Sequence, residues 1–318
     1  MTRRRTVLAL ESMMLIAVGC STETPANREA SAAQADTQSA TAPTREIDWK
    51  AVEGAMGRTG AMQPGAVYKF GMPRADLQVT VSDVRVKPAL ALGSWLAFKA
   101  TPDGAVAMGD LVLLEKEVTP VMSRLQEAGI EQTAVHHHLL RESPRVVYMH
   151  VHGHGDPMKI AEGVRAALAL TGTPAQSTSA SPAGELGIDT AQLSATLGHG
   201  GKVNGGVYQV NVPRSETIRD RGMEIPASMG LATVLNFQPT GAGKAAITGD
   251  FVMIASEVNP VIRALRQNGI EVNSLHNHLL NDEPRLFFMH FWANDDALKL
   301  ARGLRAALDA MNSQRGDR

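Results

Sequence analysis

The sequence predicts an α+β fold made of tandem duplicated domains, each with a mostly antiparallel sheet and a C-terminal β-α-β-β-α unit. Two observations lead to this prediction. Roughly 27 of the 60 positions from Gly109 to Leu168 recur 140 residues later, and a period of this length indicates a duplicated domain rather than a solenoid. Within each copy, short apolar runs typical of strands alternate with segments of helical periodicity.

The N-terminal residues 1–20 are predicted to be a lipoprotein signal peptide. Arginines 3–5 precede a mostly apolar stretch, which ends at Gly19 and Cys20. Glu11 interrupts this stretch, which is too short for a retained transmembrane helix. Small residues before the cysteine resemble a lipobox, so Cys20 is the predicted lipidation site. The arginines resemble a twin-arginine export motif and fit an ordinary Sec signal equally well.

The domain boundaries follow from composition. Residues 21–45 are rich in Ser, Thr, Ala and Pro without hydrophobic periodicity, which predicts a disordered tether. The first repeat domain is expected at 46–170 and the second at 188–312. Between them, residues 171–187 have the composition of a linker.

Within each copy the C-terminal half has clear boundaries. Apolar strands at 112–114 and 251–254 precede short helices, for which Thr119 and Asn259 are the predicted N-caps because a proline follows each. Glycines 129 and 269 end these helices. The remaining predicted elements of the first copy are a strand at 131–140, a four-residue turn at 141–144, a strand at 145–152 and a helix from about 156. The N-terminal halves look β-rich, with strands near 67–72, 77–87 and 206–212.

Charge and cysteine content exclude several functional classes. The 31 Lys and Arg residues balance 32 Asp and Glu residues, for a formal net charge of -1. Without a basic excess, nucleic acid is not an expected partner. The single cysteine excludes an internal disulfide and, from this chain alone, a thiolate zinc or iron-sulfur site.

Nine of the ten histidines lie in the two predicted β-hairpins. Side chains alternate between the faces of a strand, so His136 and His138 share one face, as do His150 and His152. Two such pairs on neighbouring strands converge on one ion if their register aligns them. A four-residue turn would put the two sets on opposite faces, and the sequence leaves this register open.

The first copy is the predicted site of a divalent transition metal, zinc or copper, because imidazole suits both ions. The predicted ligands are His136, His138, His150 and His152, with Asp156 as a possible fifth. Weaker binding is expected at the second-copy equivalents, His276, His278 and His290. Alternatively, the recurring histidines are buried and bonded to backbone, and Asp156 caps a helix. Other candidate carboxylates are Asp110, Glu117 and Glu142.

Three motifs of the second copy resemble a bacterial domain family of unknown function, found in LppY/LpqO-type lipoproteins. They are Gly249-Asp250 with the following Glu257-Val-Asn-Pro260, His276-Asn-His-Leu-Leu280, and Pro284-Arg285-x-Phe-Phe-Met-His-Phe-Trp292. The resemblance covers both copies and implies exported, often lipid-anchored proteins with tandem domains. It implies no reaction. The first copy departs from the pattern at His137 and His152.

These observations predict an exported envelope lipoprotein, periplasmic or on the outer surface, that meets the membrane through its lipid anchor. Its expected role is to bind a ligand or metal through the histidine-rich hairpin, and whether it is an enzyme is left open. The alternative is a zinc-dependent peptidase or amidase of the cell envelope, since cell-wall zinc peptidases resemble this chain in using His-x-His and His-x-x-x-Asp. Here the two motifs occur in reversed order, at His136 to His138 and His152 to Asp156.

Overall fold

The computed structural model describes residues 46–175 and 186–316. The predicted signal peptide, Cys20 and the predicted tether lie outside the described residues, as does most of the predicted linker. None of the helices in the described part of the chain has both the length and the apolar character that crossing a membrane requires.

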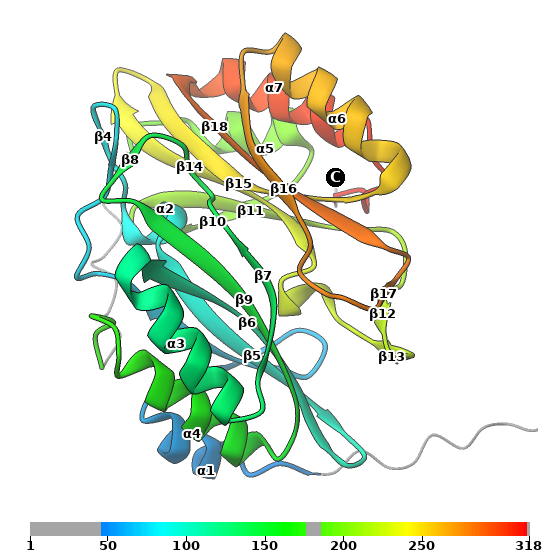
Figure 1. Ribbon diagram of the computed structural model, residues 1–318. Helices are drawn as coiled ribbons and strands as arrows, with labels where there is room; N and C mark the ends of the chain where they lie inside the picture. The colour runs from blue at the N-terminus through cyan, green and yellow to red at the C-terminus, as the bar shows by residue number, and fades with distance from the viewer. Residues whose placement is uncertain (1–45, 176–185, 317–318) are drawn as a thin grey trace, which may run out of the picture. The chain divides into compact units, whose positions relative to one another are not determined.

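The first repeat is built on a six-stranded antiparallel sheet in the order β1-β2-β5-β6-β9-β7 (Figure 1). Its strands are β1 (Ala61–Gln63), β2 (Val67–Pro73), β5 (Gly93–Thr101), β6 (Gly104–Leu114), β7 (Glu131–His136) and β9 (Val146–Gly155). A second, three-stranded sheet consists of β3 (Thr80–Val81), β4 (Val84–Arg85) and β8 (Glu142–Ser143). Strands β6 and β9 are neighbours inside the main sheet and are almost entirely buried.

Helices pack on one face of this sheet. They are α1 (Trp49–Met56), α3 (Glu115–Glu127) and α4 (Pro157–Leu168), while the short α2 (Pro88–Ala91) precedes β5. The apolar sides of α1, α3 and α4 bury Val52, Val121 and Val164 against Phe98 and Met149 of the sheet, forming the core of the repeat. The opposite face of β9 is also buried, and it carries the histidines.

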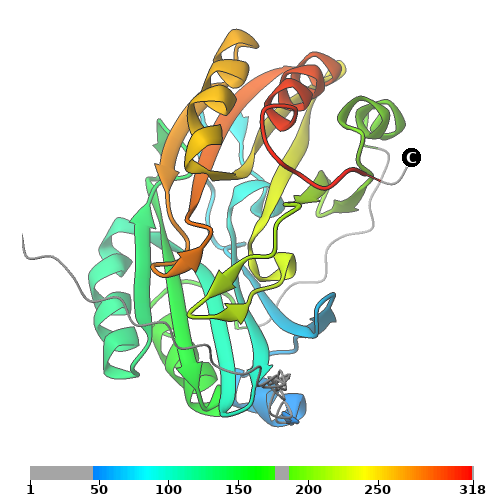
Figure 2. The same cartoon turned by 90° about the vertical axis from the view of Figure 1, so that its right-hand side faces the viewer.

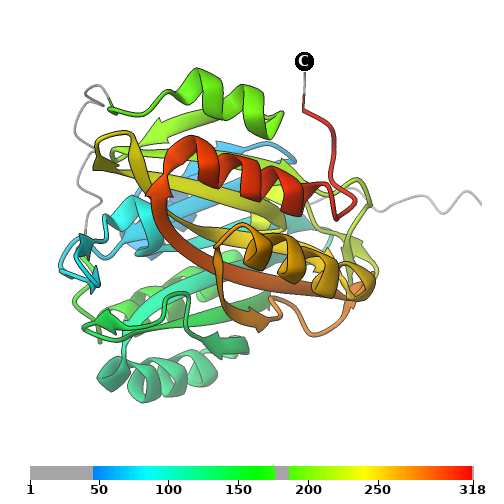
Figure 3. The same cartoon turned by 90° about the horizontal axis from the view of Figure 1, so that it is seen from above.

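The second repeat has the same arrangement, with its main sheet in the order β10-β11-β14-β15-β18-β16. The strands are β10 (Gly201–Asn204), β11 (Val207–Pro213), β14 (Ala232–Gly241), β15 (Lys244–Ile254), β16 (Glu271–His276) and β18 (Leu286–Asp296), with the short β12 (Arg219–Asp220), β13 (Met223–Glu224) and β17 (Asp282–Glu283). Helices α5 (Thr190–Leu197), α6 (Ala255–Gln267) and α7 (Ala297–Leu308) lie over this sheet, and a 3₁₀ turn, η1, covers Ala227–Met229 (Figures 2 and 3). The predicted α+β class with duplicated antiparallel domains is confirmed.

Two local predictions are wrong. Helices α3 and α6 begin at Glu115 and Ala255, five residues before the predicted first helical positions, so Pro120 and Pro260 lie inside them. Glu117 fixes the earlier start of α3, because its carboxylate accepts from the backbone N–H of Leu114 at 2.9 Å. The first hairpin has no four-residue turn: β7 ends at His136, and the connection to β9 contains β8.

A buried arginine joins helix to sheet at the same place in each repeat. Arg74 donates to Glu117 Oε2 at 2.7 Å and to the Val112 carbonyl at 2.8 Å. Arg214 makes the equivalent contacts with Glu257 at 2.6 Å and with the Val252 carbonyl. Each of these two arginines is therefore structural, since its guanidinium compensates a carboxylate that the fold removes from water.

The histidine-bearing faces of the two main sheets pack against each other. One apolar cluster joins Val81 and Tyr148 of the first repeat to Trp292, and a second joins Met108 to Phe288. Polar contacts also cross between the repeats: the Thr133 hydroxyl donates to the His278 carbonyl at 2.6 Å, and the Asn277 amide donates to the Thr133 carbonyl at 2.9 Å. The space between these contacts holds the candidate site.

Candidate metal centre

Strand register brings the histidines of each repeat to one face. His136 lies opposite Tyr148, and a bulge at Thr133 leaves Ala134 opposite His150, so His136 and His150 point the same way. In the second repeat the same bulged register puts His276 opposite Phe288 and Ser274 opposite His290. The register that the sequence left open is therefore the aligned one in both copies.

The third histidine of each repeat follows the end of the strand and lies against an aromatic ring. His138 stacks on Tyr148 with ring centroids 3.3 Å apart, and it also approaches His290 of the other repeat at 3.6 Å. His278 stacks on Phe288 at 3.5 Å and approaches His150 at 3.9 Å. Each aromatic ring thus fixes the imidazole that reaches across the interface.

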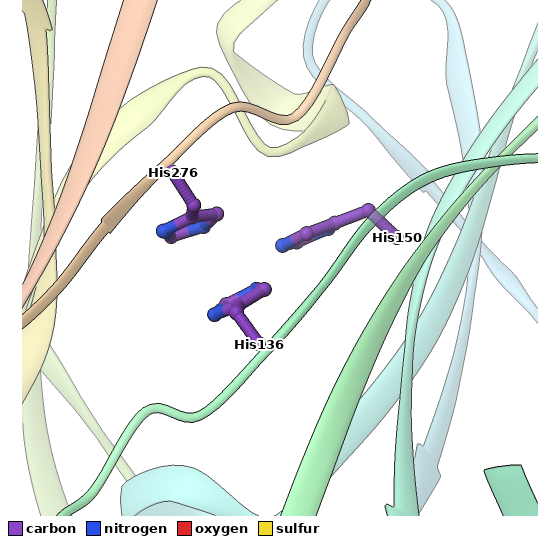
Figure 4. Close-up of side chains that lie close together, drawn as sticks. All are labelled: His136, His150 and His276. Atoms are coloured by element: carbon purple, nitrogen blue, oxygen red, sulfur yellow. The ribbon is translucent and has the colours of Figure 1, made fainter.

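These six side chains form one group, which we call the six-histidine cluster. At its centre His136 and His276 stack on each other with centroids 3.6 Å apart, and His150 points toward both (Figure 4). Its other three members are His138, His278 and His290. The sequence places the metal site in the first repeat, whereas the structure places the second-repeat equivalents in the same cluster.

Backbone hydrogen bonds orient four of the rings, including His136, whose Nδ1 lies 3.4 Å from the His137 carbonyl. His290 Nδ1 lies 2.6 Å from the Gly249 carbonyl and His278 Nδ1 lies 3.1 Å from the Gly230 carbonyl, while His150 bonds to the backbone of Gly109. A carbonyl accepts only from a protonated nitrogen, so Nδ1 carries the proton and Nε2 of each neutral ring keeps its lone pair. Metal-ligating histidines are oriented in the same way.

The nitrogens that face the cluster lack hydrogen-bond partners among the described residues. Seven buried ring nitrogens lack a hydrogen bond, namely Nε2 of all six histidines and Nδ1 of His276. A buried polar atom without a partner costs about 1–3 kcal/mol. Seven such atoms that converge on one space indicate a missing common partner rather than separate packing defects.

The recurring Gly-Asp dipeptide supplies a carboxylate from each repeat. Asp110 Oδ2 lies 3.7 Å from His138 Nε2, and Asp250 Oδ2 lies 3.2 Å from His278 Nε2. Glycine precedes each aspartate because a Cβ at Gly109 would lie 2.7 Å from the Trp95 carbonyl, and one at Gly249 would meet the Val234 carbonyl. Each glycine therefore allows the neighbouring strand to approach closely. Its backbone also orients a histidine, His150 at Gly109 and His290 at Gly249.

Ligand atoms from these residues form four groups, each within 4.8 Å. Two groups contain only histidine and include both repeats: His136, His150 and His276; and His136, His138 and His290. Each of the other two contains an aspartate: Asp110, His138 and His150; and Asp250, His276 and His278. This donor set of imidazoles with a carboxylate suits zinc, copper, nickel or iron.

Burial lowers the pKa and so favours the neutral form of five cluster imidazoles: His136, His138, His150, His276 and His290. Desolvation lowers the pKa of His136 to about 2, with further contributions from His290 and His278, and it also lowers the pKa of His276. Burial raises the pKa of Asp110 to about 8, and the charge of Asp250 adds to this effect. Neutral imidazole is the form that binds a metal.

Other predicted site residues lie elsewhere. His152 points to Asp220 of the second repeat, with Nε2 to Oδ2 at 3.4 Å. Asp156 is the N-cap of α4 and accepts from the Met158 N–H at 2.9 Å, as the alternative prediction has it. Glu117 is bound to Arg74. Glu142 Oε1 lies 3.6 Å from His137 Nδ1.

Sequence reasoning missed the aromatic supports of the cluster. Tyr148 and Phe288 each lie two positions before a cluster histidine on the same strand, so they share its face. That spacing was the signal that could have found them. The sequence of one domain contains no signal that the two repeats pack against each other.

The comparisons with known proteins give one clear match. A family model described as Domain of Unknown Function (DUF1259) matches residues 50–170 and again 191–310. No curated protein sequence matches the chain. Among solved structures, the trimeric bacterial microcompartment shell protein PduB is 11% identical, with 80% of this chain and 95% of that chain covered and a TM-score of 0.21. EtuB from Clostridium kluyveri is 11% identical, with 78% and 90% covered and a TM-score of 0.19.

Proposed function

We propose that this chain, which belongs to the DUF1259 family of domains of unknown function, binds a divalent transition metal in the six-histidine cluster. The observation that carries the proposal is the convergence of seven buried, unpartnered ring nitrogens from both repeats within the described residues. A structural role alone would give each buried nitrogen its own hydrogen-bond partner. A metal ion satisfies several of these lone pairs at once.

Zinc and copper are the ions that we expect. Both accept imidazole nitrogen, and a tetrahedral zinc site of three histidines and one carboxylate needs the residue types found around His138 and Asp110. Asp110 would lose its proton on binding, because a carboxylate ligates in its ionised form. Metal uptake should therefore release protons into the medium.

Burial favours ion binding over hydrolysis, the alternative function. The side chains of His150 and His290 are each only 4% exposed, and that of His278 is 6% exposed. A peptidase or amidase must bring a polymer backbone within bonding distance of its metal. An ion needs far less space, so storage, transfer or sensing of a metal agrees better with this environment.

The proposed location is the cell envelope. The arginines before an apolar stretch and the small residues before Cys20 support export and lipid anchoring. The resemblance to LppY/LpqO-type lipoproteins supports the same location. The partner in this proposal is the membrane, reached through acyl chains on Cys20, and it is not nucleic acid.

Calorimetric titration of the metal-free purified chain with zinc and then with copper tests metal binding. We expect saturable binding at pH 7.5. Because metal uptake releases protons, the measured heat of binding should vary with the ionisation enthalpy of the buffer. The double variant His136→Ala/His276→Ala should lose this binding, whereas His199→Ala, outside the cluster, should retain it. The absence of zinc and copper uptake by the wild-type chain would overturn the proposal.

Fractionation of cells that express Cys20→Ser tests the anchoring. We expect the wild-type protein in the membrane fraction and the variant in soluble or unprocessed form, because the acyl chains are lost. The neighbouring variant Ser21→Ala provides the control. An unchanged membrane fraction for Cys20→Ser would contradict lipidation at this residue.

A further inference from the structure

The two repeats differ at one buried position next to the six-histidine cluster. His152 follows His150 by two residues on β9 and therefore shares its face, about 7 Å farther along the strand. The equivalent residue after His290 on β18 is Trp292. The cluster thus has a polar neighbour at one edge and an apolar one at the other.

The residues around these two side chains also differ between the repeats: a polar residue faces His152, and an apolar residue lies near Trp292. Strand β12 pairs Asp220 with Asp282, and the equivalent pairing in β3 joins Val81 to Glu142. Asp220 faces His152, whereas Val81 lies in the apolar cluster that contains Trp292. One edge is therefore a His-Asp pair, whereas the opposite edge is apolar.

The polar edge continues to the surface. His152 and Asp220 are 3% and 2% exposed, and neither His152 Nε2 nor Asp220 Oδ2 has a hydrogen-bond partner among the described residues. His152 Nδ1 lies 3.7 Å from Glu131 Oε2. The Glu131 side chain is 49% exposed and pairs with Arg221 at 3.0 Å. An exposed ion pair of this kind contributes little to stability, so Glu131 separates from Arg221 readily.

We propose that Glu131, His152 and Asp220 form the polar route through which the metal ion enters and leaves the six-histidine cluster. This inference rests on the proposed function. Glu131 meets the hydrated ion at the surface, and the unpartnered atoms of His152 and Asp220 replace part of its water shell. His150 then accepts the ion, since its unpartnered Nε2 belongs to the same strand face. The edge at Trp292 and Val81 offers no ligand atom from these side chains.

The uptake rate of metal tests this route. The double variant His152→Trp/Asp220→Val gives the polar edge the residues of the apolar edge. Metal-free protein is mixed with the ion that it binds at equilibrium, uptake is stopped at intervals with excess chelator, and retained metal is counted. We expect the same final stoichiometry as wild type and an uptake rate at least tenfold lower.

The opposite edge provides the matched control. In the double-variant background, Val81→Asp/Trp292→His transfers the polar pair to the other repeat and should restore most of the uptake rate. Asp220→Asn keeps the shape of the side chain and removes its charge, so it should slow uptake in a chain that folds normally. Wild-type rates in both the double variant and Asp220→Asn would overturn the route and leave metal binding intact, whereas failure of the proposed function would appear as no uptake by wild type.

Discussion

The two repeats bring matching residues to the centre of their interface and different residues to its edges. Each contributes three histidines to the six-histidine cluster and one aspartate beside it, and each supports one histidine on an aromatic ring. At the edges, His152 with Asp220 stands opposite Trp292 with Val81. Duplication therefore kept the set of side chains that must converge on one point, while the side chains around that point diverged.

Mutation of the two buried arginines is the test of this equivalence with the largest expected effect on stability. Arg74 and Arg214 are 0% and 3% exposed and bind Glu117 and Glu257 in the same geometry. Arg74→Ala and Arg214→Ala should each lower the free energy of unfolding by about 3–5 kcal/mol, because a buried carboxylate loses its partner. Urea denaturation measures both effects.

Arg124→Ala is the control for this pair, since Arg124 forms an exposed ion pair with Glu127. It should cost less than about 0.5 kcal/mol. A loss of stability confined to Arg74→Ala or to Arg214→Ala would show that the two buried ion pairs do not contribute equally to the free energy of unfolding.

Metal affinity gives the second test. The sequence predicts that loss of first-copy histidines matters more than loss of their second-copy equivalents. The stacked pair in the structure leads to a different expectation: His136→Ala and His276→Ala should weaken binding equally, by at least about 100-fold, or about 2.7 kcal/mol. Competition against a chelator of known affinity measures both. A large loss for His136→Ala alone would restore the prediction made from the sequence.

The stability of the metal-free chain should fall below neutral pH. Burial lowers the pKa of His136, His138, His150, His276 and His290 below the unfolded value of 6.5. A lowered histidine pKa contributes stability that is present above pH 6.5 and is lost as pH falls, because the unfolded chain takes up more protons. Each such histidine lowers the free energy of unfolding by about 1.4 kcal/mol for every pH unit below 6.5.

Asp110 acts in the opposite direction. Its pKa is raised to about 8, so its contribution is greatest below its unfolded value of 3.8 and is lost as pH rises toward 8. Five histidines outweigh this one carboxyl group, so urea midpoints should drop steeply from pH 7 to 5.5. The variant His136→Gln/His276→Gln should flatten this drop, and a midpoint independent of pH would contradict neutral buried imidazoles.

The sequence predicted more of the fold than of the site. Internal repetition and the spacing of apolar residues were enough for the α+β class, because both are properties of one chain segment. The start of α3 was missed because the signal at Pro120 is local, whereas Glu117 is held by Arg74, 43 residues away. The recurring histidines were identified, but their common cluster depends on two sheets packing face to face. No periodicity within one repeat encodes that contact.

Mutation of the helix caps is the test with the smallest expected effect. It distinguishes a capping role for Asp156 from a role as a metal ligand. Asp156 accepts from the Met158 N–H, and its equivalent Asp296 accepts from the Lys299 N–H at 2.8 Å. Asp156→Ala and Asp296→Ala should each cost about 1 kcal/mol of unfolding free energy, the usual effect of losing an N-cap. Neither should change zinc or copper affinity. Replacement by Asn, which also caps helices but is a weaker metal ligand, should restore most of the stability. A drop in metal affinity for Asp156→Ala without one for Asp296→Ala would mean that this carboxylate reaches the ion after all, and that the first repeat holds a ligand that the second lacks.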